Sequence, residues 1–134
     1  RCRVYAAPFA VRLFEKEGDA PEDVDTVVEP DITVVCDTGK LDKYGCKGAP
    51  ELVIEVLSPS TRRHARLVKL DLYQRAGVAE YWLVDPENQS VQVLLLGKEG
   101  YLLPHEDYGR RDIAKVNALE GCFIELEKVF PEEK

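Results

Sequence analysis

Residues Glu51–Leu57 (ELVIEVL) form an almost continuous apolar run. Such a run is typical of a central strand that is buried on both faces of a sheet. Glu55 is the carboxylate inside this run, and burying an isolated carboxylate is costly unless it is paired, protonated or bound to a metal. A salt bridge to an arginine and a metal site are both open at this point.

The residues that follow the run predict a helix and then a hairpin. Ser58–Thr61 (SPST) ends the strand and supplies hydroxyl side chains that can cap a helix. We predict the helix at Arg62–Ala76, with Gly77 as its C-cap. Glu80–Asp85 and Ser90–Leu96 flank a short turn and predict a β-hairpin. Two further segments are weaker strand candidates, Tyr101–Leu103 and Cys122–Leu126.

The residues before the run predict more strands. Arg1–Leu13 is β-like and is broken by Pro8, and Glu15–Pro21 has the acidic, glycine-containing composition of a hairpin tip. Thr26–Asp37 predicts a further strand, which a proline near its middle restricts to an edge or a bulge. Thr38–Pro50 predicts a loop. An order of strands, one main helix and strands again predicts a mixed α/β sheet within one domain, residues 1–134.

Asp31 follows that proline inside the Thr26–Asp37 strand. Since side chains alternate between the two faces of a strand, Asp31 lies on the face opposite Ile32 and can meet Glu55 if the two strands are neighbours. Two carboxylates that converge in a partly buried site suit magnesium or manganese. The alternative is that Asp31 only shapes the bend after the proline.

Lys69 interrupts the apolar stripe of the predicted helix. At helical spacing it falls among the side chains that should face the sheet, namely Ala65, Val68, Leu72, Tyr73 and Ala76. A lysine in such a place usually extends along its methylene stem to solvent. Because this helix follows the Glu55 strand directly, Lys69 could instead extend toward the two acids.

The charge of the whole chain argues against long-range attraction to nucleic acid. The net charge is −7, although a local basic patch is compatible with it. Glu80 and Asp85, at the two ends of a predicted strand, are expected to carry surface charge only. No apolar run approaches the roughly 20 residues of a membrane helix, so we expect no membrane association.

The four cysteines are Cys2, Cys36, Cys46 and Cys122, and none of them forms a C-x-x-C pair. This spacing disfavours a structural zinc site. We expect free thiols in a reducing compartment, and therefore a cytoplasmic protein.

Three segments carry a resemblance to a known family: EPDITVVCD (29–37), GAPELVIEVLSPSTRR (48–63) and KLDLYQRAGVAEYWLVDPE (69–87). Together they resemble the Uma-two-type restriction endonucleases, a large bacterial family of the PD-(D/E)XK nuclease superfamily. The resemblance implies a restriction-endonuclease-like fold, with Asp31 as the first acid of the motif and Glu55 as the second. The motif lysine normally stands at the position of Leu57, and in this family Lys69 of the next helix is its match.

The sequence also departs from the family pattern. An acidic residue is common at the position of Ala65, and Gly-Glu is common where this chain has Leu67 and Val68. Family members usually begin with a further helix and strand, so the chain is expected to be truncated at its N-terminus. An exposed sheet edge or a homodimer interface is expected where those elements would pack.

The resemblance implies metal-assisted hydrolysis of phosphodiester bonds. Asp31, Glu55 and the Val56 carbonyl would hold magnesium or manganese, and Lys69 would orient the attacking water or stabilise charge on the phosphate. The candidate DNA phosphate contacts are basic residues at the helix start, Arg62, Arg63, His64 and Arg66. The alternative for them is an ordinary solvated helix face.

Three functions remain open. The first is a magnesium-dependent DNA endonuclease, and the second is a non-catalytic interaction or regulatory module on the same scaffold. The third is hydrolysis of small phosphate compounds, which suits an acidic surface better than duplex DNA does.

Overall fold

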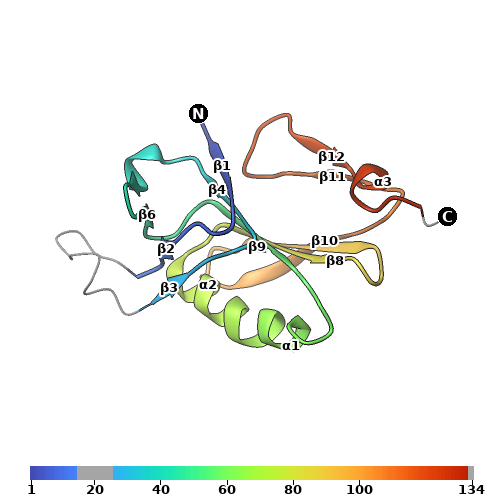
Figure 1. Cartoon of the computed structure of the whole chain (residues 1–134), viewed down its shortest axis with the longest axis horizontal. Coiled ribbons are helices and arrows are strands. Elements are labelled where there is room, and N and C mark those ends of the chain that lie inside the picture. The colour runs from blue at the N-terminus through green and yellow to red at the C-terminus, as the bar shows by residue number, and fades with distance from the viewer. Residues whose placement is uncertain (15–25, 133–134) are drawn as a thin grey trace.

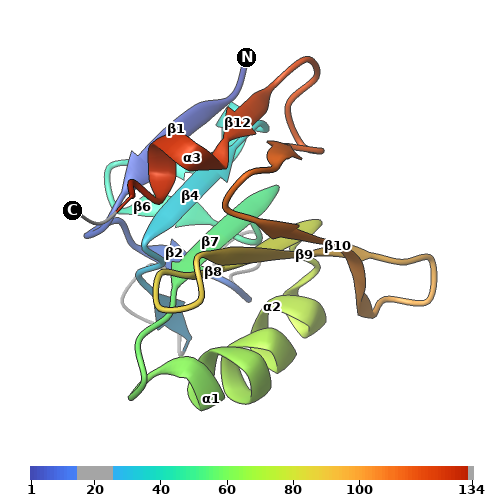
Figure 2. The ribbon, with the colours of Figure 1, turned by 90° about the vertical axis from the view of Figure 1, so that its right-hand side faces the viewer.

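The computed structural model describes residues 1–14 and 26–132. The apolar run forms β7 (Leu52–Val56), a central strand of a six-stranded sheet with the order β1-β4-β7-β8-β9-β10 (Figure 1; β7 is labelled in Figure 2). Within this sheet β7 and β8 are parallel, and every other neighbouring pair is antiparallel. The remaining strands of this sheet are β1 (Arg3–Ala6), β4 (Ile32–Val35), β8 (Glu80–Asp85), β9 (Ser90–Leu96) and β10 (Leu102–Gly109).

One continuous helical segment connects the parallel pair β7 and β8. It consists of α1 (Arg62–His64), a π-helical turn η3 (Ala65–Lys69) and α2 (Leu70–Ala76). It ends at Gly77, whose φ of 90° is a left-handed conformation that glycine adopts without strain. Parallel strands require a crossover of this kind. The helix and its C-cap are therefore confirmed, and the wide π-helical turn inside the helix is an addition to the predicted element.

The helical segment and the C-terminal elements lie on opposite sides of the sheet (Figure 2), and an apolar cluster is buried on each side. The helical segment packs on one face, over a buried cluster that includes Val53, Tyr73 and Tyr81. The opposite face carries a second cluster that includes Trp82 and Phe130. That face is covered by the C-terminal elements, β11 (Ile113–Lys115), β12 (Phe123–Glu125) and α3 (Leu126–Val129). The predicted class, mixed α/β with one main helix on a mixed sheet, is confirmed.

A four-stranded sheet of short strands stands beside the large one, in the order β3-β2-β6-β5. Its elements are β2 (Val11–Arg12), β3 (Val27–Val28), η2 (Thr38–Lys40), β5 (Leu41–Asp42) and β6 (Gly45–Lys47). The prediction of a loop at Thr38–Pro50 was therefore wrong. Cys46 explains why, because its fully buried side chain anchors the segment in the core. The predicted hairpin tip, Glu15–Pro21, lies outside the described residues.

The strand predicted at Thr26–Asp37 is divided by the proline between its halves. Its first part, β3, joins the small sheet, and its second part, β4, joins the large one. Pro30 has no backbone N–H to donate, so the ladder cannot continue through it. The break places Asp31 directly before β4.

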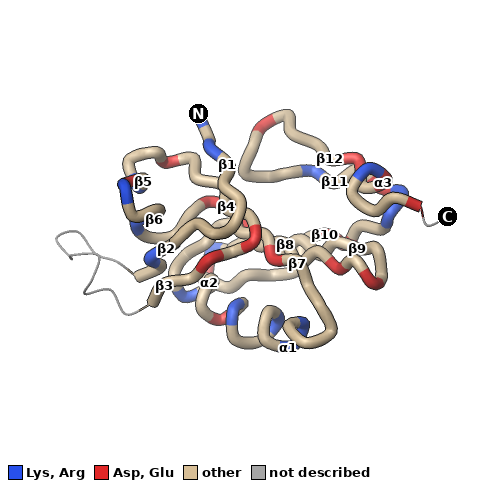
Figure 3. The backbone as a smooth tube through the Cα atoms, in the orientation of Figure 1, with Lys and Arg blue, Asp and Glu red and all other residues tan. Residues whose placement is uncertain are grey.

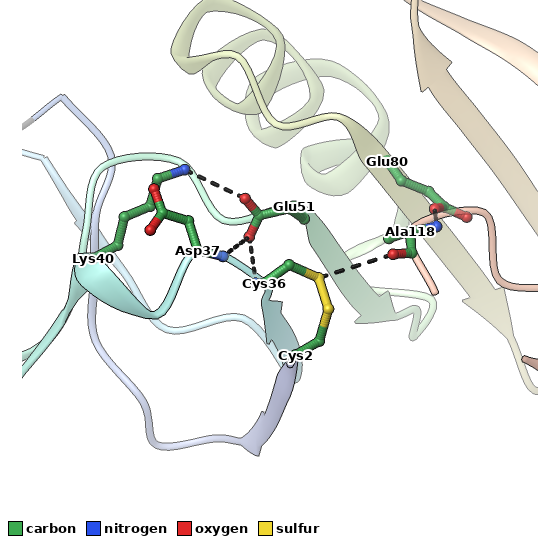
Figure 4. The surroundings of a disulfide bond; sticks show 7 residues. All are labelled: Cys2, Cys36, Asp37, Lys40, Glu51, Glu80 and Ala118. Atoms are coloured by element: carbon green, nitrogen blue, oxygen red, sulfur yellow. Dashed lines mark hydrogen bonds and ion pairs between the residues drawn. A yellow bond between two sulfur atoms is a disulfide. The ribbon is translucent and has the colours of Figure 1, made fainter. Parts of the chain in front are cut away.

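Cys2 and Cys36 form a disulfide (Figure 4), so the prediction of four free thiols was wrong for this pair. The register of β1 on β4 pairs Arg3 with Val35 and so brings the two cysteines beside each other. The backbone N–H of Cys36 donates to Glu51 at 2.6 Å. Cys46 and Cys122 are free.

Glu80 and Asp85 are buried, with 1% and 4% of their surfaces exposed, so the prediction of surface charge was wrong for both. Glu80 accepts hydrogen bonds from the Trp82 indole, from the backbone N–H groups of Asn117 and Ala118, and from the Asn117 amide. Asn117 and Ala118 lie 37 and 38 positions further along the chain, so a local sequence pattern does not reveal these contacts. Glu80 therefore fastens the C-terminal layer to the sheet.

No helix in the described ranges is both long and apolar enough to cross a membrane.

Candidate active site

A pocket of about 210 Å³ opens between the ends of β4 and β7 and the helical segment. The register pairs Ile32 with Ile54, so the next position places Asp31 opposite Glu55. Asp31 Oδ2 accepts a hydrogen bond of 2.6 Å from the backbone N–H of Val56. The pocket is lined by Glu29, Asp31, Glu55, Val56, Ser58, Thr61, His64, Ala65 and Lys69.

Glu55 is 4% exposed and has two side-chain partners on the helix. Its Oε2 accepts hydrogen bonds from Lys69 Nζ at 3.0 Å and from the Tyr73 hydroxyl at 2.6 Å. The ion-pair partner of Glu55 is thus a lysine rather than an arginine. The second partner, Tyr73, was classed in the sequence with the apolar stripe, and its role was missed.

Lys69 is the last residue of the π-helical turn η3, and it lines the pocket. One extra residue in a turn changes which side chains face the sheet. Lys69 comes to lie on the same side as the buried Ala65, while Val68 turns away and is 48% exposed, so its predicted place in the stripe was wrong. The Tyr81 hydroxyl donates a hydrogen bond of 2.9 Å to the carbonyl of Ala65, at the start of this turn.

Tyr73 is fully buried and packs edge-on against Tyr81, with ring centroids 5.0 Å apart. Burial, together with the nearby Glu55 carboxylate, raises the pKa of Tyr73 far above its ordinary value. The phenol therefore stays protonated and donates its hydrogen to Glu55. One general signal could have indicated this contact: a buried tyrosine usually needs a hydrogen-bond partner.

The donor set fits a magnesium ion that keeps most of its waters. Among the described residues no group of three or more His, Cys, Asp or Glu side chains could hold a metal ion. Mg²⁺ is commonly bound through only one or two carboxylates together with waters. The hydrogen bonds of the described residues use Oδ2 of Asp31 and Oε2 of Glu55. The second oxygen of each carboxylate is therefore left to accept other ligands.

The arginines at the helix start lie together, but two of them already have partners. Arg62 forms an ion pair with Asp85, and Arg66 donates to Gln92 at 2.7 Å. Arg63 is exposed. The three arginines line an open groove together with Pro59 and Leu67. Figure 3 shows the basic positions of this helix below the sheet.

The Arg62–Asp85 contact predicts a pH dependence of stability. The Arg62 guanidinium, helped by Asn88, holds the pKa of Asp85 well below its usual range. Because the pKa of Asp85 in the folded protein lies below the unfolded value of about 3.9, the ionised carboxylate stabilises the fold fully at pH values above about 3.9. This contribution is lost as the pH falls below that value. We expect the melting temperature to fall more steeply from pH 6 to pH 3 in the wild type than in Asp85→Asn.

Circular dichroism melts across this pH range measure the difference. Asp71→Asn is the matched control, because it removes the acid of an exposed ion pair with Arg75 and should reproduce the wild-type slope. Parallel curves for the wild type and Asp85→Asn would contradict the prediction.

Comparison with known proteins gives a fold relative and a family. A search of curated proteins finds no match. The structure is similar to that of "a putative nuclease belonging to DUF820 from Anabaena variabilis ATCC 29413", with a TM-score of 0.65 and 19% sequence identity over 96% of this chain and 68% of that chain. At this identity the likeness shows a shared fold. The family model Uma2, described as "Putative restriction endonuclease", matches residues 1–127, and the chain therefore belongs to the Uma2 family.

Proposed function

We propose that this protein is a magnesium-dependent endonuclease that hydrolyses DNA phosphodiester bonds. One observation carries the proposal: Asp31, Glu55 and Lys69 come from three different elements and line one pocket, with Lys69 Nζ 3.0 Å from Glu55. Family membership supports the reaction class. The availability of one oxygen on each carboxylate supports the use of a hard divalent cation.

Each residue has a distinct task in this proposal. Asp31, Glu55 and the Val56 carbonyl hold the cation. When bound, magnesium polarises the scissile phosphate and lowers the pKa of a water molecule. Lys69 balances the charge of Glu55 in the resting protein, and it stabilises the negative charge that develops on the phosphate during attack.

The arginine groove is the proposed contact for the DNA backbone. Arg63, whose side chain is exposed, is the first candidate for a phosphate contact. Arg66 would exchange its neutral partner Gln92 for a phosphate, and Arg62 would have to share its guanidinium with Asp85. A few local contacts of this kind are compatible with a net charge of −7. The homodimer and the cytoplasmic location expected from the sequence stay predictions.

Calorimetric titration with Mn²⁺ tests the metal site directly. We expect Glu55→Gln to weaken binding by more than about 100-fold, because it removes a ligand rather than a supporting contact. Glu51→Gln is the matched control, because Glu51 directly precedes the same strand, β7, but its carboxylate contacts Cys36 and Lys40 outside the pocket. The control should bind Mn²⁺ as the wild type does, and equal binding by Glu55→Gln would refute the assigned site.

A non-catalytic interaction module is the second candidate. The acidic net charge favours it, and so does the Lys69 amine, which already offsets Glu55 without a metal. If the wild-type protein neither binds Mn²⁺ nor nicks supercoiled plasmid, the result favours this candidate.

A further inference from the structure

Two hydrogen-bond donors meet on one oxygen of Glu55. Lys69 Nζ and the Tyr73 hydroxyl both donate to Oε2, at 3.0 and 2.6 Å. Within the described residues Oε1 accepts no hydrogen bond, and it is not among the buried polar atoms that lack a partner. The two oxygens of this carboxylate are thus in different environments, with one bound to the helix and the other open to the pocket.

The two donors differ in how firmly they are held. The Lys69 side chain is 28% exposed and has a long flexible stem. Tyr73 is fully buried, has few rotatable bonds and is packed against Tyr81. Lys69 therefore supplies charge, whereas the direction of the carboxylate depends on the more rigid partner.

We propose that Tyr73 is a positioning residue, whose hydroxyl holds Oε2 of Glu55 so that Oε1 faces the pocket and is available to a divalent cation. The inference rests on the proposed function, since it concerns the same metal site. The hydroxyl, rather than the aromatic ring, performs this task, because the ring contacts the core and only the oxygen atom reaches Glu55.

The test compares two variants that each lose one buried hydroxyl. Tyr73→Phe removes the contact with Glu55 and keeps the packed ring. Tyr81→Phe is the matched control, because its hydroxyl donates to the Ala65 carbonyl and to no proposed metal ligand. Circular dichroism spectra and melts confirm that both variants are folded at the assay temperature. Calorimetry then measures Mn²⁺ binding by each.

We expect Tyr73→Phe to bind Mn²⁺ about 10- to 100-fold more weakly, the usual effect of losing a group that supports a metal ligand. Tyr81→Phe should bind as the wild type does. In plasmid nicking, raising the Mn²⁺ concentration should restore the rate of Tyr73→Phe, with KM for DNA unchanged. A purely structural role would lower the melting temperature without moving the affinity for Mn²⁺.

The outcomes separate the inference from the function on which it rests. If the wild type binds Mn²⁺ and Tyr73→Phe binds it equally well, the positioning role is overturned and the proposed function stays in place. The same holds if both variants lose binding to the same extent. No Mn²⁺ binding by the wild type overturns the proposed function and the inference together. Weaker binding by Tyr73→Phe alone, with rescue by added Mn²⁺, supports the inference.

Discussion

Lys69→Ala is expected to nick supercoiled plasmid about 10²- to 10³-fold more slowly than the wild type, the range found when one group that stabilises transition-state charge is removed. Its affinity for Mn²⁺ should be unchanged or higher, because the amine that competes for Glu55 is gone. This combination separates Lys69 from Glu55, whose substitution should strongly weaken binding of the ion itself. Initial nicking rates at saturating Mn²⁺, together with calorimetry, measure both quantities.

Lys98→Ala is the matched control for this loss of charge. Lys98 is exposed in the turn between β9 and β10 and does not line the pocket. The control should retain the wild-type rate. Equal rates for Lys69→Ala and the wild type would show that the nicking comes from a contaminant or that Lys69 has no part in the reaction.

Glu80→Ala is expected to have the largest effect on stability, about 3–5 kcal/mol, because it leaves several buried donors without an acceptor. Four N–H groups of the described residues converge on this carboxylate, from Trp82, Asn117 and Ala118. For a chain of this length the melting temperature should fall by roughly 10–20 °C. Chemical denaturation followed by circular dichroism measures the free energy of unfolding.

Glu106→Ala serves as the control, since Glu106 is exposed on β10 and should change the stability by less than about 0.5 kcal/mol. Glu80→Gln should lie between the two, because its amide oxygen can accept some of the four bonds while its NH₂ group opposes the others. A loss below about 1 kcal/mol for Glu80→Ala would contradict the role assigned to this buried acid.

The elements that the sequence predicted well have strong local signals. ELVIEVL has an almost continuous apolar pattern, and the helix has a glycine C-cap. The hairpin of Glu80–Asp85 and Ser90–Leu96 appears with the predicted bounds. The elements that it predicted poorly depend on distant contacts. The Cys2–Cys36 bond joins residues 34 positions apart, and no spacing rule specifies such a pair.

The residues of the candidate site likewise fall into two groups, those that local patterns predicted and those that depend on distant contacts. Alternation along two strands placed Asp31 and Glu55 on one face, and helical spacing placed Lys69 on the inner side of the helix. Tyr73 was missed because an aromatic residue in an apolar stripe predicts packing, whereas its hydroxyl proves to be the closer of the two donors to Glu55. The burial of Asp85 was missed because its partner, Arg62, lies in another element.

The bond between Cys2 and Cys36 turns residues 2–36 into a covalent ring that contains Asp31. A protease that cuts the backbone once inside this ring leaves two fragments that stay covalently linked until a thiol reduces the disulfide. Ring closure also restricts the unfolded chain, by about 4 kcal/mol for a loop of this size in the loop-entropy model. Dithiothreitol would therefore convert the sample into a chemically different polymer, and nicking rates or melting curves are comparable only at one thiol concentration.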